Sequence, residues 1–355
     1  MSDVMNGGKV RKDYVRALDL KNGRVDMSHG SGGRAMAQLI EQLFAAAFDN
    51  DYLRQGNDGA LLPPPDGRLV MATDCHVVSP LFFPGGDIGC LSVHGTINDV
   101  AVMGATPLWL SAGFILEEGF PLADLQRIVQ SMAQAAQEAG VHIVTGDTKV
   151  VEQGKGDGVF ITTTGVGVVA DDVHLSGDRA RAGDRILVSG TIGDHGMAIM
   201  AQRESLGFSS AITSDTAALH GLTAALLDSG ADIHVLRDPT RGGLATTLNE
   251  IAAQSGVGMM LDERAIPVTP AVASACEFLG LDPLYVANEG KLVVIVAAPD
   301  AERALAALRA HPLGKNAAIV GTVHEDDHHF VQMTTSFGGR RIVDWLSGEQ
   351  LPRIC

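Results

Sequence analysis

Four aspartates in the first half of the chain stand at the ends of apolar segments, where their carboxylates could face a cleft. Each one alone could equally be a helix cap or a turn residue, a common role of Asp. As a set they differ, because buried carboxylates repel one another unless a cation neutralises them. Mg²⁺ takes oxygen ligands and usually shares them with substrate phosphates. The set therefore predicts a metal and nucleotide site made by Asp58, Asp74, Asp99 and Asp147.

A glycine-rich segment, His29-Gly30-Ser31-Gly32-Gly33, precedes an apolar pattern of helical spacing over 34–48. Glycines leave backbone N–H groups open to phosphate oxygens, and a helix N-terminus adds positive potential. The segment matches neither the dinucleotide-binding fingerprint nor the P-loop. A flexible lead-in to the helix is therefore the competing interpretation.

Three charged residues in short motifs could take part in chemistry. Lys149 follows Asp147-Thr148 and could reach a polyphosphate or a developing oxyanion, although most single lysines are merely exposed. Arg241, within 238–243, could bind a phosphate or carboxylate in a bidentate manner, and a structural turn fits that motif nearly as well. Glu289, in Asn288-Glu289-Gly290-Lys291, could be a general base, with a turn ahead of a strand as the simpler interpretation.

The four cysteines do not form a disulfide scaffold in a chain of this length. Cys75, Cys90 and Cys276 fall in segments that we expect to be core. Cys355 is the last residue and follows Leu351-Pro352-Arg353-Ile354. A thiol at the end of a mobile tail can be carried between sites, whereas an accidental exposed thiol is the ordinary interpretation. Prenylation is excluded, because it requires a cysteine four places from the end.

The composition excludes several classes of protein. The 355 residues are 46% hydrophobic and 19% charged, which is typical of a globular chain. The formal net charge of -16 is unfavourable for binding nucleic acid or an anionic membrane surface. No segment approaches the ~20 apolar residues that span a bilayer, and the N-terminus lacks the apolar region of a secretory signal. We therefore predict a cytoplasmic protein that binds neither nucleic acid nor membrane.

Two α/β domains must position the candidate residues, because helices and strands are mixed in both halves. In the first half we expect helices over 34–48, 88–104 and 121–139 and strands over 69–78, 108–116, 141–145 and 159–169. In the second half we expect helices near 216–229, 242–254, 270–279 and 301–310 and strands near 184–189, 257–261, 291–298, 317–323 and 329–333. The boundaries predict domains over 28–172 and 173–346 and a mobile tail over 347–355. His94 and His195 fit either a core position or a site.

Taken in order, these motifs resemble the carbamoyl dehydratase family of nickel-iron hydrogenase maturation, known as hydrogenase maturation protein E. The family is part of the superfamily of aminoimidazole ribonucleotide synthetase and selenophosphate synthetase. The most specific matches are Gly146-Asp147-Thr148-Lys149 and the terminal Pro352-Arg353-Ile354-Cys355. The likeness begins near residue 28, so residues 1–27 look like an N-terminal extension. It implies an α/β (α+β) fold of two domains with a flexible C-terminal tail. It also implies a homodimer whose N-terminal sheets pair into a barrel, with ATP bound beside it.

The resemblance also implies a reaction. A partner carbamoyltransferase would load a carbamoyl group onto the sulfur of Cys355, and ATP with Mg²⁺ would activate its oxygen for loss as phosphate. The resulting S-cyano group would pass cyanide to iron on a partner scaffold complex. Lys149 would stabilise the oxygen under attack, Glu289 would take protons, and the four aspartates would hold metal. The implied nucleotide contacts are His29, Gly30, Ser31, Gly32, Gly33, Asn98, Thr148, Arg241 and Asn288.

Two other functions are consistent with the motifs. A synthetase or kinase of the same superfamily would act on a free small molecule, and Cys355 would then be dispensable. Selenophosphate synthetases carry a reactive Cys or selenocysteine near the glycine-rich loop, and residues 29–33 contain none. A non-catalytic module would use the terminal cysteine to deliver a metal, without ATP turnover, and would leave the aspartate set unexplained.

Overall fold

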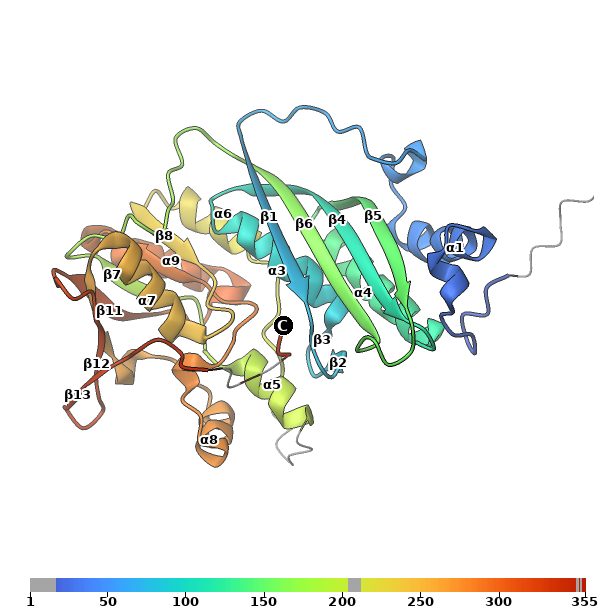
Figure 1. The fold of residues 1–355 in the computed structure, drawn as a ribbon. Coiled ribbons are helices and arrows are strands. Elements are labelled where there is room, and N and C mark those ends of the chain that lie inside the picture. The colour runs from blue at the N-terminus through green and yellow to red at the C-terminus, as the bar shows by residue number, and fades with distance from the viewer. Residues whose placement is uncertain (1–16, 204–211, 349–350, 352) are drawn as a thin grey trace, which may run out of the picture.

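A computed structural model describes residues 17–203, 212–348, 351 and 353–355 of the chain. Two domains of mixed helix and strand lie next to each other, and the C-terminus lies between them (Figure 1). Both domains contain the helices and strands that hydrophobic periodicity predicts, apart from the differences noted below. Within the described residues, no helix is both long and apolar enough to cross a membrane.

The first domain is built on a four-stranded sheet of order β1-β6-β4-β5. Strand β6 is antiparallel to both of its neighbours, and β4 and β5 are parallel. The strands are β1 (Arg68–His76), β4 (Thr106–Glu117), β5 (His142–Val151) and β6 (Val159–Val169). This order leaves β1 and β5 as the two edges of the sheet.

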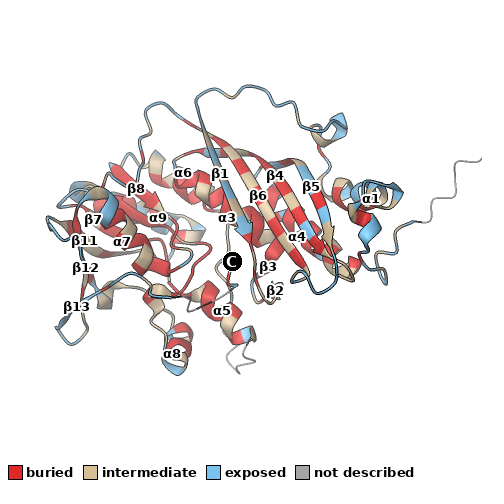
Figure 2. Ribbon diagram, viewed as in Figure 1, coloured by how far each residue is buried: buried red, intermediate tan, exposed pale blue. Residues whose placement is uncertain are grey.

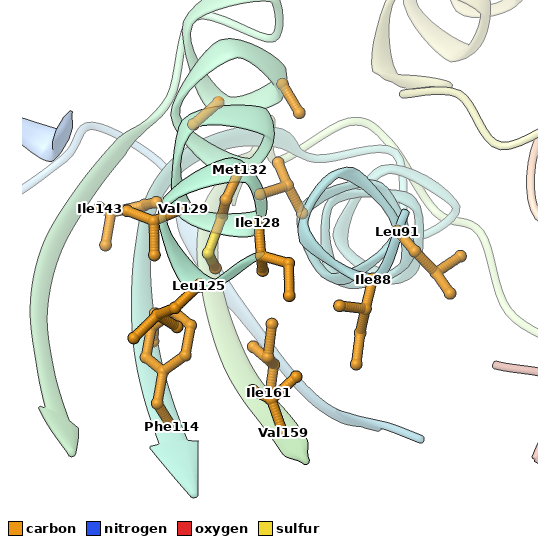
Figure 3. Close-up of a cluster of buried hydrophobic side chains, with 14 of the residues drawn as sticks. Ile88, Leu91, Phe114, Leu125, Ile128, Val129, Met132, Ile143, Val159 and Ile161 are labelled. Atoms are coloured by element: carbon orange, nitrogen blue, oxygen red, sulfur yellow. The ribbon is translucent and has the colours of Figure 1, made fainter. Parts of the chain in front are cut away.

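Helices α3 (Ile88–Ala101) and α4 (Leu122–Glu138) cover one face of this sheet. Side chains from both helices meet alternate residues of the strands in a single apolar cluster (Figure 3), because a strand turns successive side chains to opposite faces. Fully burying a Leu or Ile is worth about 1.5–3 kcal/mol relative to exposing it, so this cluster fixes which face points inward.

The opposite face of the sheet, here called the open face, carries exposed residues (Figure 2). Leu69 is 64% exposed, Met71 72% and Ile115 43%. Cys75 is also exposed and lies opposite Thr162. The prediction that Cys75 is a core residue is therefore wrong: alternation along β1 turns it away from the helices. Cys276 is buried as predicted, and Cys90 is half-buried.

The segment before the sheet is helical from Arg34 to Phe48, as predicted, but its middle turns are π-helical. The helical segment consists of α1 (Arg34–Leu39), η2 (Ile40–Ala45) and α2 (Ala46–Phe48). Two short turns flank it, η1 (Met27–Gly30) and η3 (Leu53–Gln55). A short hairpin, β2 (Phe82–Phe83) and β3 (Gly86–Asp87), leads into α3. Asp87 caps α3 by accepting hydrogen bonds from the N–H groups of Gly89 and Cys90.

The second domain has a seven-stranded sheet of order β13-β12-β9-β11-β7-β10-β8, with apolar clusters on both faces. Its strands are β7 (Arg185–Val188), β8 (Ile233–Arg237), β9 (Gly258–Asp262), β10 (Val293–Val296), β11 (Ala318–His324), β12 (Val331–Thr334) and β13 (Arg340–Ile342). Its helices are α5 (Asp194–Arg203), α6 (His220–Asp228), α7 (Gly243–Ser255), α8 (Pro270–Leu279) and α9 (Ala301–Ala310), with short turns η4 (Glu263–Ala265), η5 (Pro283–Tyr285), η6 (Ala298–Asp300) and η7 (Pro312–Gly314). Sequence periodicity missed β8 and β13, which are too short to show a clear repeat.

Candidate functional site

The end of the chain is docked between the two domains. The N–H of Val77 donates to the Cys355 carbonyl oxygen at 3.1 Å, and the N–H of Ser79 donates to the Arg353 carbonyl oxygen at 3.1 Å. The side chain of Ile354 is buried in the apolar cluster of the first domain. The described part of the predicted mobile tail therefore occupies a defined position, and residues 349, 350 and 352 lie outside the described part.

Docking places the terminal thiol against a buried carboxyl group. The thiol of Cys355 lies beside the carboxyl group of Glu289, which is 3% exposed and has one oxygen, Oε1, without a hydrogen-bond partner among the described residues. Burial raises the pKa of Glu289 well above its usual range, and the nearby carboxylates of Asp238 and Asp215 add to this. Burial and Glu289 likewise raise the pKa of the Cys355 thiol. The docked thiol therefore holds its proton at neutral pH, and the carboxyl group of Glu289 takes up a proton more readily than an exposed one.

Further carboxyl groups surround this pair, and together we call them the junction cluster: Cys355, Glu289, Asp74, Asp99 and Asp238. Burial raises the pKa of Asp99 to about 7, with Asp238 and Asp74 adding repulsion. Burial also raises the pKa of Asp238 to about 6. Arg241 is the cation beside them, with its Nη2 3.8 Å from Asp74 Oδ1. An enclosed set of acids of this kind is typical of a site that moves protons.

Asn98 and Asn288 hold the junction together instead of facing a ligand. The Nδ2 of Asn98 donates to the carbonyl oxygens of Ala217 and Glu289, at 3.0 and 3.2 Å. Asn288 is fully buried, donates to the Pro239 carbonyl and accepts from the Gly193 N–H. The sequence predicts phosphate contacts for both amides. In the structure their hydrogen-bonding groups are committed to main chain, which positions Glu289.

The Gly146-Asp147-Thr148-Lys149 motif lies within β5, although the sequence predicts that the strand ends before it. Alternation along the strand then separates its side chains. Asp147 and Lys149 are on the open face, each with its side chain 63% exposed, and form an ion pair of 3.0 Å. The hydrogen bond from Lys149 lowers the pKa of Asp147. Thr148 turns inward, is 5% exposed and belongs to the wall of the cavity described below, so its phosphate contact stays a prediction.

The glycine-rich segment packs against the same strand. The Nδ1 of His29 accepts a hydrogen bond from the Asp26 N–H at 3.0 Å, which closes a capping box around η1. His29 is buried, so its side chain stabilises the turn and does not face a ligand. Gly30 lies against Val150, where a Cβ atom would clash with the backbone. Nothing stands within 4 Å of where a side chain of Gly33 would be, so this part of the loop is open.

A cavity of about 650 Å³, here called the edge cavity, lies between the helical segment 34–48 and β5. Its wall combines aromatic rings with a flexible glycine-containing turn, and its polar groups include two of the four predicted aspartates. The lining residues used below are Phe44, Phe48, Tyr52, Asp58, Asp147 and Thr148. A volume of this size accommodates a nucleotide.

The structure does not bring the four aspartates into one cluster. Asp58 and Asp147 line the edge cavity, whereas Asp74 points toward α3 on the helix-covered side. Three strand spacings, roughly 14 Å, also separate β1 from β5. Among the residues that the structure describes, no three His, Cys, Asp or Glu side chains are grouped to hold a metal. The predicted four-carboxylate constellation is therefore wrong for a single chain, and Lys149 is likewise distant from Cys355.

Sequence reasoning missed two residues of the junction, Lys291 and Asp215, and left His195 undecided between a core position and a site. Lys291 Nζ lies 3.1 Å from Asp215 Oδ2 in a buried ion pair, and Asp215 Oδ1 accepts from the Glu289 N–H. Lys291 stands in the motif that contains Glu289, which was the available signal. His195 is fully buried and bonded to the tail. No sequence pattern marks Asp215, because its partners come from distant segments.

Comparison with known proteins identifies the class of this architecture. Residues 56–169 match the AIR synthase related protein N-terminal domain, and residues 181–334 match the corresponding C-terminal domain. The two matches correspond to the two domains described above. They define an AIR synthase-related protein, as the sequence motifs predict.

Closer relatives narrow this class. The chain is 70% identical over 349 residues to carbamoyl dehydratase HypE of Cupriavidus necator, covering 98% of this chain and 99% of the relative. A crystal structure of hydrogenase maturation protein HypE in complex with ATP is 53% identical, with a TM-score of 0.90, covering 93% of this chain and 99% of that one. The matching chain in a crystal structure of a HypE-HypF complex is 53% identical, with a TM-score of 0.76. The match covers 87% of this chain and 99% of that one. The chain belongs to the HypE carbamoyl dehydratases, enzymes of hydrogenase maturation, which confirms the predicted family, fold class and activity.

Proposed function

We propose that this chain uses ATP to dehydrate a carbamoyl group carried on its own Cys355, which becomes an S-cyano group. The observation that carries the proposal is the docking of the Cys355 thiol beside the buried carboxyl group of Glu289. A synthetase acting on a free small molecule has no use for a terminal thiol docked in this way. A metal-delivery module does not account for it either, because the docked thiol is protonated and metals bind thiolate.

The raised pKa of Cys355 implies that loading happens elsewhere. A thiolate is the nucleophilic form of cysteine, and the junction disfavours it. We propose that the tail leaves the junction, accepts the carbamoyl group from a partner carbamoyltransferase, and returns. A relative forms a HypE-HypF complex, which supports a partner that acts on the tail.

Dehydration proceeds through phosphorylation of the carbamoyl oxygen. The carbamoyl oxygen on Cys355 attacks the γ-phosphorus of ATP and releases ADP, and a first proton leaves nitrogen to give an O-phosphorylated imidate. A second proton leaves nitrogen, the C–O bond breaks with phosphate as the leaving group, and a carbon–nitrogen triple bond forms. Glu289, in its carboxylate form, takes the proton, because its raised pKa makes it a stronger base than an exposed carboxylate. The S-cyano group is released as cyanide when an iron-carrying acceptor complex supplies an electron pair.

The edge cavity fits ATP and one magnesium ion. Its aromatic wall of Phe44, Phe48 and Tyr52 suits a base, and the open part of the glycine-rich loop lies along the same strand. Mg²⁺ is usually held by one or two carboxylates together with phosphate oxygens, and Asp58 and Asp147 supply two. When bound, the ion neutralises phosphate charge. Lys149 adds a cation beside the cavity, through its ion pair with Asp147. A relative binds ATP, which supports this assignment.

A dimer resolves the separation between the edge cavity and the thiol. The exposed Leu69, Met71 and Ile115 make the open face suitable for a second copy. If two such sheets close into a barrel, the edge strand β5 of one copy pairs with the edge strand β1 of the other. The cavity of one protomer then stands beside the junction cluster of its partner. We therefore propose that each complete site is shared between two copies.

Intact mass spectrometry tests the function directly. The chain is incubated with a partner carbamoyltransferase, a carbamoyl donor and ATP with Mg²⁺. We expect one carbamoyl group to be gained and then one water to be lost, with both changes absent in Cys355→Ala. Cys75→Ala is the matched control and should behave as the wild type, because Cys75 is on the open face. A wild-type Cys355 that stays unmodified under these conditions overturns the proposal.

A further inference from the structure

The last three carbonyl groups of the chain are each held by a different donor. Val77 and Ser79 donate from the main chain to the carbonyls of residues 355 and 353. These bonds are two residues apart on both segments, which is the spacing of antiparallel strand pairing. The middle carbonyl, of Ile354, faces the second domain and lies 2.7 Å from His195 Nε2. Main-chain groups of one domain and two side chains of the other, His195 and Arg203, therefore hold the same tripeptide.

His195 is oriented by a short hydrogen-bond relay. The N–H of Thr216 donates to Ser214 Oγ at 3.1 Å. Ser214 Oγ is in turn 2.8 Å from His195 Nδ1, and its own hydroxyl hydrogen is free to point there. This leaves the single ring hydrogen of a neutral imidazole on Nε2, where it donates to Ile354. Burial lowers the pKa of His195, which is consistent with a neutral ring.

The remaining environment of the ring fixes its place. His195 is fully buried near the start of α5, and Phe83 of the first domain meets it edge-on at 5.6 Å between ring centres. A core histidine would satisfy both nitrogens within its own domain. His195 instead directs one nitrogen at the backbone of the segment that carries the reactive thiol.

We propose that His195 is a positioning residue that holds the last peptide unit, so that the loaded Cys355 side chain faces Glu289. The inference rests on the proposed function of the tail. His195 does not touch the reacting atoms. His195 influences the fraction of time that the tail is docked. Without the hydrogen bond from His195, the Ile354 carbonyl would be buried without a partner. Loss of such a bond in a buried site reduces the ratio of docked to undocked tail by about ten- to a hundredfold.

Thiol reactivity tests the docking without ATP or any partner. The probe is a thiol-specific reagent, applied in a Cys75→Ser background, with labelling of Cys355 read from the C-terminal peptide by mass spectrometry. We expect His195→Phe to raise the labelling rate of Cys355 about tenfold or more. His195→Gln keeps an amide donor at similar reach and should stay close to the wild type. His234→Gln is the matched control, because His234 is buried but bonds Asp184 and not the tail.

Dehydration provides the second measurement. His195→Phe should gain the carbamoyl group at least as fast as the wild type, since loading takes place outside the junction, and should then accumulate it because water loss slows about tenfold or more. His195→Gln should restore most of the water loss. The inference is overturned if His195→Phe matches the wild type in both measurements. It is also overturned if His195→Gln is as impaired as His195→Phe while both unfold at the wild-type temperature. A wild type that never gains the carbamoyl group defeats the proposed function, and thiol labelling then still decides the role of His195 in docking.

Discussion

The two sides of the sheet in the first domain carry the same residue types in opposite electrostatic states. On the helix-covered side, burial raises the pKa of Asp99 to about 7 and that of Glu289 well above its usual range. On the open face, Asp147 is exposed and Lys149 lowers its pKa. Burial and the available counter-charge account for this contrast. One side thus holds carboxyl groups with raised pKa values, which suit proton transfer, and the other holds charges suited to phosphate.

Glu289→Gln should have the largest effect, because it removes a proton acceptor and keeps the shape of the side chain. We expect loss of water from the carbamoylated tail to slow about a hundred- to ten-thousandfold, with loading unchanged. Quenched mass spectrometry in a single turnover measures both steps. The surface variant Glu138→Gln is the control. A full dehydration rate in Glu289→Gln would remove its assignment as the base.

The helix-covered side should also determine the acid sensitivity of the fold. Burial lowers the pKa of His94, in α3, to about 4 from 6.5. The unfolded chain therefore binds more protons than the native chain below pH about 6.5, so stability falls as the pH drops from about 6.5 toward about 4. His94→Gln removes this term, which amounts to about 3 kcal/mol at 1.4 kcal/mol per pKa unit. Urea unfolding at several pH values measures it. The variant should lose less stability than the wild type between pH 7 and pH 4.5, and an equal loss would contradict the assignment.

Mixing two inactive variants tests whether the two sides act together across a dimer. One variant carries Asp147→Asn and Lys149→Met on the open face, and the other carries Glu289→Gln in the junction cluster. If each site is shared between copies, half of the randomly formed dimers contain one intact site, so activity returns to about a quarter of the wild type. A site contained within one chain gives no recovery. Dehydration is assayed after the variants are co-refolded, and each variant mixed with itself is the control.

The smallest effect is expected at the surface of the docked tail. Arg353 Nη1 lies 2.8 Å from Asp157 Oδ2, and both side chains are about half exposed. Exposed ion pairs contribute about 0.2–1 kcal/mol, so Asp157→Asn should raise Cys355 labelling by no more than about fivefold, and less in high salt. A larger effect than that of His195→Phe would show that the ion pair, and not the main chain, holds the tail.

Much of this arrangement is predictable from the sequence, because the spacing of apolar residues indicates which side chains are buried. The helices that cover the first sheet and the alternating strand 159–169 follow from apolar spacing. The Glu289 motif is also visible, since it precedes a run of apolar residues that forms β10.

Other parts are not predictable, because they depend on which face of a strand a residue occupies. A break expected near residue 145 placed Asp147 at a strand end with the other aspartates. Strand β5 instead continues through Asp147 and places that side chain on the open face. The side chain of Asp74 points to the other side of the sheet, toward α3. The roles of Asn98 and Asn288 were also hidden, because their partners are main-chain groups that carry no sequence signal.

The bond between the Val77 N–H and the oxygen of the final residue has a practical consequence for work with this enzyme. An affinity tag fused after Cys355 would continue the peptide from this docked carbonyl group, at a position between the two domains. A tagged or read-through protein would fold and bind nucleotide yet fail to dock its thiol. Affinity tags should therefore be placed elsewhere on the chain. If a protein tagged after Cys355 is inactive, the loss of activity cannot be attributed to the catalytic residues.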